Sequence, residues 1–245
     1  MKRHVPNLIT CLNVTCGAMA IFLVMHDRVF FAAACVLLAM VFDFLDGWFA
    51  RWLRVTSEMG KELDSLADVV SFGVVPALLA HVLIKEALAG EFTAWWASVL
   101  LYSPAVIPAF SAYRLAKFNL DTRQGHSFIG MPTPAHALFW VALIFSRRYT
   151  PALHDALWSS PWLLVACVLF FSVLLISGLP MFSLKIYSFA WRANRWRYSY
   201  FAVSLLLFLL FRVDMISFLI PLYVLFAALE AACRSFRVTR RGCSR

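Results

Sequence analysis

Four aspartates crowded into one short stretch are the residues of this sequence best suited to chemistry. The chain has eight aspartates, and Asp43, Asp46, Asp64 and Asp68 lie within 26 residues of one another. On a helix, the i, i+3 spacing of the first pair and the i, i+4 spacing of the second place each pair on a single face. We therefore expect two helices that direct four carboxylates into one small volume.

Carboxylates gathered in this way repel one another unless cations neutralise them. The nearby Arg51 and Lys61 supply too little positive charge for four aspartates. An all-oxygen ligand set suits Mg²⁺, Mn²⁺ or Ca²⁺ rather than Zn²⁺. The pattern thus predicts a divalent metal site. Two alternatives use the same aspartates: an interhelical salt-bridge network with Arg51, Arg54 and Lys61, and the acidic site of a channel or divalent-cation transporter.

Small residues stand one helical turn from these aspartates, on the same helix faces. They are Gly47, Ala50 and Gly60. A bulky side chain at any of these positions would fill the space beside the carboxylates. The small residues therefore predict a ligand that lies against the helix backbone.

The elements that must position these residues are membrane-spanning helices. Of the 245 residues, 62% are hydrophobic and 14% are charged, whereas soluble domains have about half and about a quarter. So much apolar surface excludes a soluble globular protein and a disordered chain. We expect an all-α, polytopic helix bundle that forms a single membrane domain over residues 1–245.

Uncharged stretches predict about eight transmembrane helices. A single helix over the last two stretches would be about 48 Å long, too long for a ~30 Å bilayer core, so we expect a tight hairpin there, with two additional C-terminal helices over about 197–234. The stretches are Val5–Met25, Val29–Phe42, Val69–Ile84, Phe92–Tyr113, Gln124–Ser146, Ala156–Leu184, Tyr198–Phe211 and Met215–Leu229.

The basic residues predict an orientation for this bundle. With both termini in the cytoplasm, eight spans leave 17 of the 22 Lys and Arg residues inside and five outside, as the positive-inside rule requires. The net charge of +9 then reflects contact with membrane lipids rather than with nucleic acid. We expect a multi-pass protein of the cell inner membrane whose aspartates face the cytoplasm.

The complete pattern resembles the signature of the CDP-alcohol phosphotransferase family. It reads Asp43-x2-Asp46-Gly47-x2-Ala50-Arg51-x8-Gly60-x3-Asp64-x3-Asp68, with every fixed position present. Members of this family move a phosphatidyl or similar group from a CDP-linked donor to an alcohol and release CMP. The resemblance implies that the four aspartates hold two ions of Mg²⁺ or Mn²⁺, that Asp68 is the general base, and that the chain forms a homodimer. It also implies a CDP site formed by Asp43, Gly47, Ala50, Arg51, Gly60 and Asp64.

Further segments resemble the bacterial membrane-bound phosphatidylserine synthases. They are Pro6–Thr10, Ser65–Ala77, Tyr113–Asn119 and Phe128–Pro134. This resemblance implies CDP-diacylglycerol as the donor and L-serine as the acceptor, in phospholipid biosynthesis.

A zwitterionic acceptor needs a cation for its carboxylate and oxygen atoms for its ammonium group. The candidates are Ser65, Ser71, Arg114, Lys117 and Asn119. Lys117 replaces the usual arginine of the family and loses its bidentate fork, and Arg114 and Lys117 could equally be ordinary interfacial side chains. Glycerol 3-phosphate is the alternative acceptor, although this dianion would require a denser basic pocket.

Overall fold

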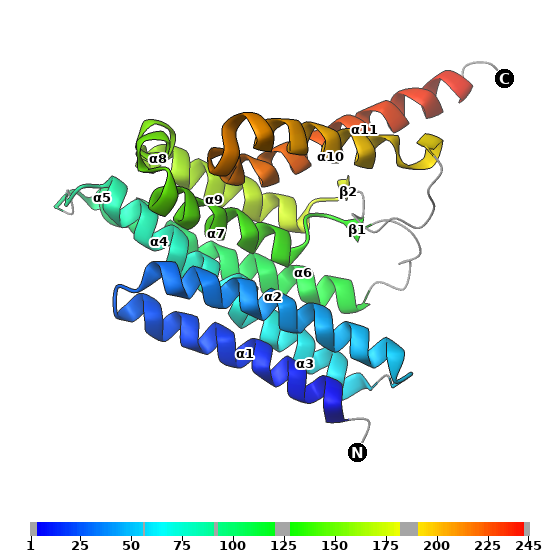
Figure 1. Cartoon of the computed structure of the whole chain (residues 1–245), viewed down its shortest axis with the longest axis horizontal. Helices are drawn as coiled ribbons and strands as arrows, with labels where there is room; N and C mark the ends of the chain where they lie inside the picture. The colour runs from blue at the N-terminus through cyan, green and yellow to red at the C-terminus, as the bar shows by residue number, and fades with distance from the viewer. Residues whose placement is uncertain (1–3, 56, 91–92, 121–127, 182–190, 243–245) are drawn as a thin grey trace.

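The computed structural model describes residues 4–55, 57–90, 93–120, 128–181 and 191–242, which are almost entirely helical (Figure 1). Helices α1 (His4–Met25) and α2 (Val29–Trp52) form an antiparallel pair at one side of the bundle. Ala32 and Ala33 are fully buried, and such small residues allow close packing between membrane helices.

The third and fourth spans are each built from several helical segments. α3 (Glu58–Asp68) continues through a π-helix (Val69–Val74) into α4 (Val75–Ala87). The next span consists of α5 (Trp95–Tyr102), a 3-10 turn and α6 (Val106–Leu120). Helix α6 packs against the π-helix, so the third span is held between α1 and α6.

The middle of the bundle is formed by α7 (Thr133–Tyr149) and α9 (Pro161–Ile176). Between them, the short α8 (Pro151–Trp158) meets α9 at an angle of 79°. Two-residue strands, β1 (Phe128–Ile129) and β2 (Pro180–Met181), pair antiparallel next to these helices.

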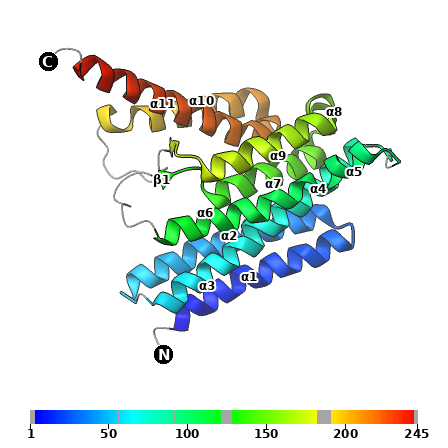
Figure 2. The ribbon, with the colours of Figure 1, turned by 180° about the vertical axis from the view of Figure 1, so that it is seen from behind.

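The C-terminal helices lie on the side of the bundle opposite α1 (Figures 1 and 2). α10 (Trp191–Phe211) and α11 (Leu219–Gly242) are joined by a 3-10 segment and pack against each other as a hairpin. The Tyr200 hydroxyl donates a hydrogen bond to the Leu219 main-chain oxygen at 3.4 Å. This contact ties the middle of α10 to the start of α11.

The expected all-helical membrane bundle is confirmed, and the protein is an integral membrane protein. Five described helices are long and apolar enough to span a membrane, or six if α8 and α9 count as one bent span. The number of eight spans stays a prediction, because α7 has only 17 residues and α10 is not among the five. The predicted span 156–184 is broken between α8 and α9. Helix α7 begins at Thr133, whereas the predicted span begins at Gln124, which lies outside the described residues.

Candidate active site

Three of the predicted metal ligands converge where α2 faces α3. One carboxylate oxygen from each of Asp43, Asp64 and Asp68 lies within 4.8 Å of the other two. Asp46 is close enough to add electrostatic repulsion to this group, and its Oδ2 accepts a 2.6 Å hydrogen bond from the Thr10 hydroxyl. The two helix faces predicted from the sequence therefore meet.

The carboxylate cluster fits a divalent cation. Oδ1 of Asp64 is buried and has no hydrogen-bond partner among the described residues. Within the described part of the chain, none of the four aspartates forms an ion pair with a lysine or arginine. The Nζ of the nearby Lys61 instead donates to the Asn119 main-chain oxygen at 2.9 Å. A buried charge without a counterion is costly. A divalent cation bound by the carboxylate oxygens is therefore the fitting counterion. The salt-bridge alternative gains no support.

Helix α1 contributes polar groups whose roles were not recognised in the sequence. Thr10 contacts Asp46, and Asn13 Nδ2 donates to Asp68 Oδ1 at 3.5 Å. Asn7, Thr10 and Asn13 are spaced three residues apart, so they share one face of α1. That spacing, within an otherwise apolar helix, was the available signal.

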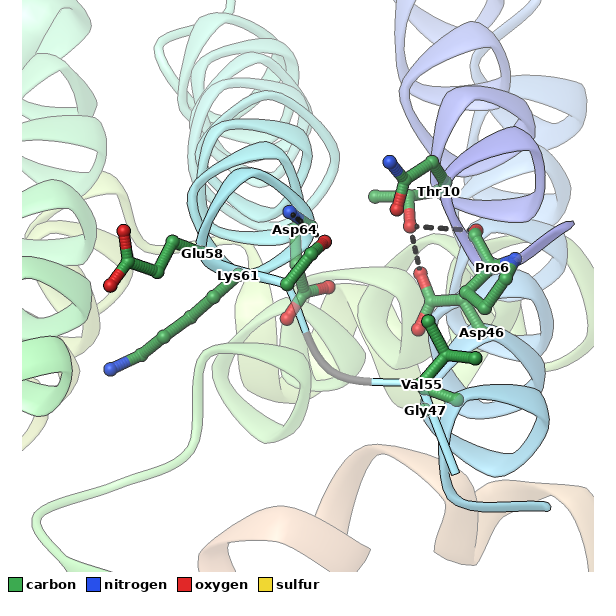
Figure 3. Close-up of a pocket in the computed structure, with 12 residues that line it drawn as sticks. Pro6, Thr10, Asp46, Gly47, Val55, Glu58, Lys61 and Asp64 are labelled. Carbon is green, nitrogen blue, oxygen red and sulfur yellow. Dashed lines mark hydrogen bonds between the residues drawn. The ribbon is translucent and has the colours of Figure 1, made fainter. Parts of the chain in front are cut away.

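A cavity of about 510 Å³ lies beside the carboxylates, between the start of α1, the end of α2 and the start of α3. In Figure 3, Asp46 and Asp64 face each other across this space, whereas Glu58 and Lys61 extend away from Asp46. The three small residues predicted to leave room for a ligand all line the cavity. The lining residues are Pro6, Asn7, Thr10, Asp46, Gly47, Ala50, Val55, Ser57, Glu58, Gly60, Lys61 and Asp64.

Gly60 also allows α3 to begin close to α1. The Ser57 hydroxyl accepts a hydrogen bond from the Gly60 backbone N–H at 3.0 Å and thereby caps α3. A Cβ atom on Gly60 would lie 2.9 Å from Ser57 Oγ and 3.0 Å from Asn7 Oδ1. Arg51 lies over Gly47, because a Cβ atom there would be 3.6 Å from an Arg51 guanidinium nitrogen.

Arg114 is the acceptor-site candidate placed beside the carboxylates. Its side chain is buried in α6, donates to Thr133 Oγ1 at 3.2 Å and attracts the Asp68 carboxylate electrostatically. Its Nε has no hydrogen-bond partner among the described residues. Lys117, one turn farther along α6, is exposed.

The other three candidates are engaged in contacts between helices. Asn119 Nδ2 donates to Ser65 Oγ at 2.8 Å, which links the end of α6 to α3. Ser71 is fully buried, and its hydroxyl donates to the Asn13 main-chain oxygen at 3.1 Å. These contacts place Ser65 and Asn119 together and Ser71 against α1.

Comparison with known proteins identifies the family. Residues 3–174 match the family model described as CDP-alcohol phosphatidyltransferase. CDP-diacylglycerol–serine O-phosphatidyltransferase of Mycobacterium tuberculosis is 35% identical over 183 residues, which are 72% of this chain and 60% of that protein. The Bacillus subtilis protein of the same name is 35% identical over 62% of this chain and 80% of its own length.

Another relative carries a different name. Archaetidylserine synthase of Methanothermobacter thermautotrophicus is 34% identical over 71% of this chain and 67% of its own length. The chain spans about 60% of the length of the mycobacterial relatives that it matches. The family match includes all four aspartates and ends within α9, before the C-terminal hairpin. From the matched residues and the geometry of the aspartates, the chain belongs to the CDP-alcohol phosphatidyltransferase family.

Proposed function

We propose that this chain transfers the phosphatidyl group of CDP-diacylglycerol to the hydroxyl of L-serine, giving phosphatidylserine and CMP for phospholipid biosynthesis. The observation that carries the proposal is the meeting of Asp43, Asp64 and Asp68 beside the 510 Å³ cavity. The names of the bacterial relatives support serine as the acceptor.

The cavity is the proposed site for the CDP part of the donor. Its volume falls within the range of about 300–1,000 Å³ that small-molecule sites occupy. Arg51 supplies a fixed cation for a phosphate group, and the small residues leave the backbone accessible to the nucleotide. The residues assigned to CDP are Asp43, Gly47, Ala50, Arg51, Gly60 and Asp64, of which Gly47, Ala50, Gly60 and Asp64 line the cavity.

Asp43, Asp46, Asp64 and Asp68 would hold the divalent cations, which we propose to be two ions of Mg²⁺ or Mn²⁺. When bound, these ions would neutralise negative charge on the pyrophosphate of the donor. The 4.8 Å spacing and the unpartnered Asp64 oxygen support this assignment.

Asp68 is the proposed general base. It takes the proton from the serine hydroxyl, whose oxygen then forms a bond to the lipid-linked phosphorus. The bond from that phosphorus to the CMP oxygen breaks, and CMP leaves with the electron pair. Arg114 is suitably placed to hold the serine carboxylate because it lies near Asp68 and a guanidinium binds carboxylates well. Ser65, Lys117 and Asn119 are the other proposed acceptor-site residues, whereas the buried Ser71 hydroxyl already donates to Asn13.

The proposal also includes the setting of the site. The aspartates would face the cytoplasm at the inner membrane, where soluble serine and CMP can exchange, and the chain would act as a homodimer. Residues 1–245 would form one domain, with the chemistry in residues 43–68 and the C-terminal hairpin as an addition to it.

The proposal is tested by measuring CMP release from the purified chain in detergent with CDP-diacylglycerol and Mg²⁺ or Mn²⁺. L-serine, glycerol 3-phosphate and no acceptor are compared. We expect serine-dependent release that a chelator abolishes. Release with glycerol 3-phosphate alone would overturn the acceptor, and no release with any alcohol would overturn the transferase and favour a cation transporter.

A further inference from the structure

The third span changes its helical winding directly after Asp68. Residues Val69–Val74 form a π-helix, and the Val75 N–H donates to the Val70 main-chain oxygen, an i→i+5 hydrogen bond. A π-turn contains one more residue than an α-turn, and one residue corresponds to about 100° of rotation. The π-helix therefore determines how Asp64 and Asp68 are rotated relative to α4.

One side of the π-helix is fastened to α1 through Ser71. Its hydroxyl donates to the Asn13 main-chain oxygen at 3.1 Å. Gly17 follows Asn13 by one turn and leaves the room that this contact needs. A Cβ atom on Gly17 would lie 2.5 Å from Ser71 Oγ and 3.1 Å from Ser71 Cα. The two backbones can therefore touch only because position 17 lacks a side chain.

The other side of the π-helix rests on α6. A Cβ atom on Gly73 would lie 3.2 Å from Ser111 Cβ and 3.5 Å from Pro108 Cα. Close contacts on both sides leave the π-helix little freedom to rotate.

The contact with α1 leads directly to Asp68. Asn13 accepts from Ser71 with its main-chain oxygen and donates to Asp68 Oδ1 with its side-chain amide. One residue of α1 thus touches both the π-helix and the carboxylate proposed as the base.

We propose that Ser71 is a positioning residue that fixes the π-helix to α1 and thereby sets the direction of the Asp68 carboxylate. This inference rests on the transferase function proposed above. It gives Ser71 an indirect role in place of contact with the acceptor, because its hydroxyl is fully buried and already donates to Asn13.

The first test compares Ser71→Ala with Ser172→Ala. Ser172 is a matched control, since it is 1% exposed in α9 and its hydroxyl has no hydrogen-bond partner among the described residues. We expect Ser71→Ala to lower kcat by ~10-fold or more, because small misplacement of a reacting group costs up to about 10²-fold. The KM values for both substrates should stay within about 2-fold, and Ser172→Ala should retain the wild-type kcat.

The second test repeats Ser71→Ala in an Asp68→Asn background. In this background position 68 can no longer act as a base, so its orientation has little effect on turnover. If Ser71 acts through Asp68, adding Ser71→Ala should therefore lower kcat by less than about a further 2-fold. A general structural defect would lower kcat by the same factor in both backgrounds and would overturn the inference. A wild-type kcat for Ser71→Ala would also overturn it.

A third variant keeps the inference testable if Asp68→Asn has too little activity to measure. Gly17→Ala alters no polar side chain but displaces Ser71, whereas Gly178→Ala has no heavy atom within 4 Å of the new Cβ. We expect Gly17→Ala alone to lower kcat with KM unchanged, and equal kcat values for the two variants would contradict the inference.

If the wild type itself shows no serine-dependent CMP release, the proposed function fails, whereas an active wild type with an unaffected Ser71→Ala overturns only the inference.

Discussion

At the scale of single residues, the site combines converging aspartates of α2 and α3 with polar side chains of α1 that contact two of the four aspartates. The spacing of Asp43 and Asp46, and of Asp64 and Asp68, determines which face of each helix they occupy, irrespective of the remaining fold. The contacts of Thr10 and Asn13 depend instead on how α1 packs against α2 and α3. The spacing of Asn7, Thr10 and Asn13 indicates a shared polar face of α1, but it does not indicate which aspartate each residue contacts. The sequence likewise could not show that Arg114 is buried while Lys117 is exposed.

Asp68→Asn should lower turnover by ~10²-fold or more, because general-base catalysis typically contributes 10²–10⁴-fold. The amide keeps the size of the carboxylate but cannot take the serine proton. CMP release measures turnover, and binding of CDP-diacylglycerol should largely persist. Near-normal turnover would rule out Asp68 as the base.

Asp43→Asn and Asp64→Asn should each raise the Mn²⁺ or Mg²⁺ concentration needed for half-maximal activity by ~10-fold or more. Each change removes one anionic ligand, and cation affinity depends on the number of charged ligands. A metal titration of CMP release provides the measurement. Asp27→Asn is the control, because Asp27 lies in the turn between α1 and α2, away from the cluster. Full activity in excess chelator would refute the metal site.

Thr10→Val should lower kcat/KM by ~10-fold, since hydrogen bonds to charged groups are worth about 1.5–3 kcal/mol. Valine has nearly the shape of threonine but cannot donate to Asp46. Thr15→Val is the control on the same helix, because the Thr15 hydroxyl bonds to the Cys11 main-chain oxygen and not to the site. Equal kcat/KM values for the two variants would show that the Asp46 contact is unimportant.

At the scale of elements, hydropathy located the helices but not their interruptions. The stretch Val69–Ile84 is uncharged and mostly apolar, and its hydropathy does not indicate that its first six residues form a π-helix. The stretch 156–184 is also uncharged, yet Pro161 begins a new helix after Ser159 and Ser160. Proline favours the first turn of a helix, and that preference was the available sign of the break.

Gly130→Ala should lower the free energy of unfolding by ~1–3 kcal/mol, the usual cost of one strained backbone residue. Gly130 has φ +80°, and a Cβ atom there would lie 2.7 Å from the Leu175 main-chain oxygen. Unfolding in detergent, followed by circular dichroism, measures the change. Gly178→Ala is the control and should behave as the wild type, and an equally stable Gly130→Ala would contradict the expected strain.

At the scale of the whole molecule, the carboxylate cluster and the cavity lie toward one end of the bundle. The start of α1, the end of α2, the start of α3 and the end of α6 lie together there, and α11 ends on the same side (Figures 1 and 2). The turn between α1 and α2 lies at the opposite end, together with the ends of α4 and α7 (Figure 1). Glu86 and Arg147, near the ends of these two helices, form a 2.8 Å ion pair. The distribution of Lys and Arg in the sequence predicts that the end with the aspartates faces the cytoplasm.

Thiol labelling should distinguish the two membrane faces in a variant without native cysteines. Met59→Cys in α3 should react with a membrane-impermeant reagent only in inverted vesicles, and His26→Cys in the opposite turn only in intact cells. Both native residues are exposed, and the positive-inside rule sets the expected direction. The reverse labelling pattern would invert the proposed orientation.

The positions of Asp46 and Asp64 near helix ends also bear on how the chain enters the bilayer during synthesis. Asp46 lies within two turns of the end of α2, and Asp64 within two turns of the start of α3. Each helix can therefore insert while these carboxylates remain near the lipid headgroups, which avoids the ~2.5–3.5 kcal/mol charged to an aspartate at the bilayer centre. We therefore expect the helices to insert one after another, with the carboxylate cluster completed when they associate laterally within the membrane.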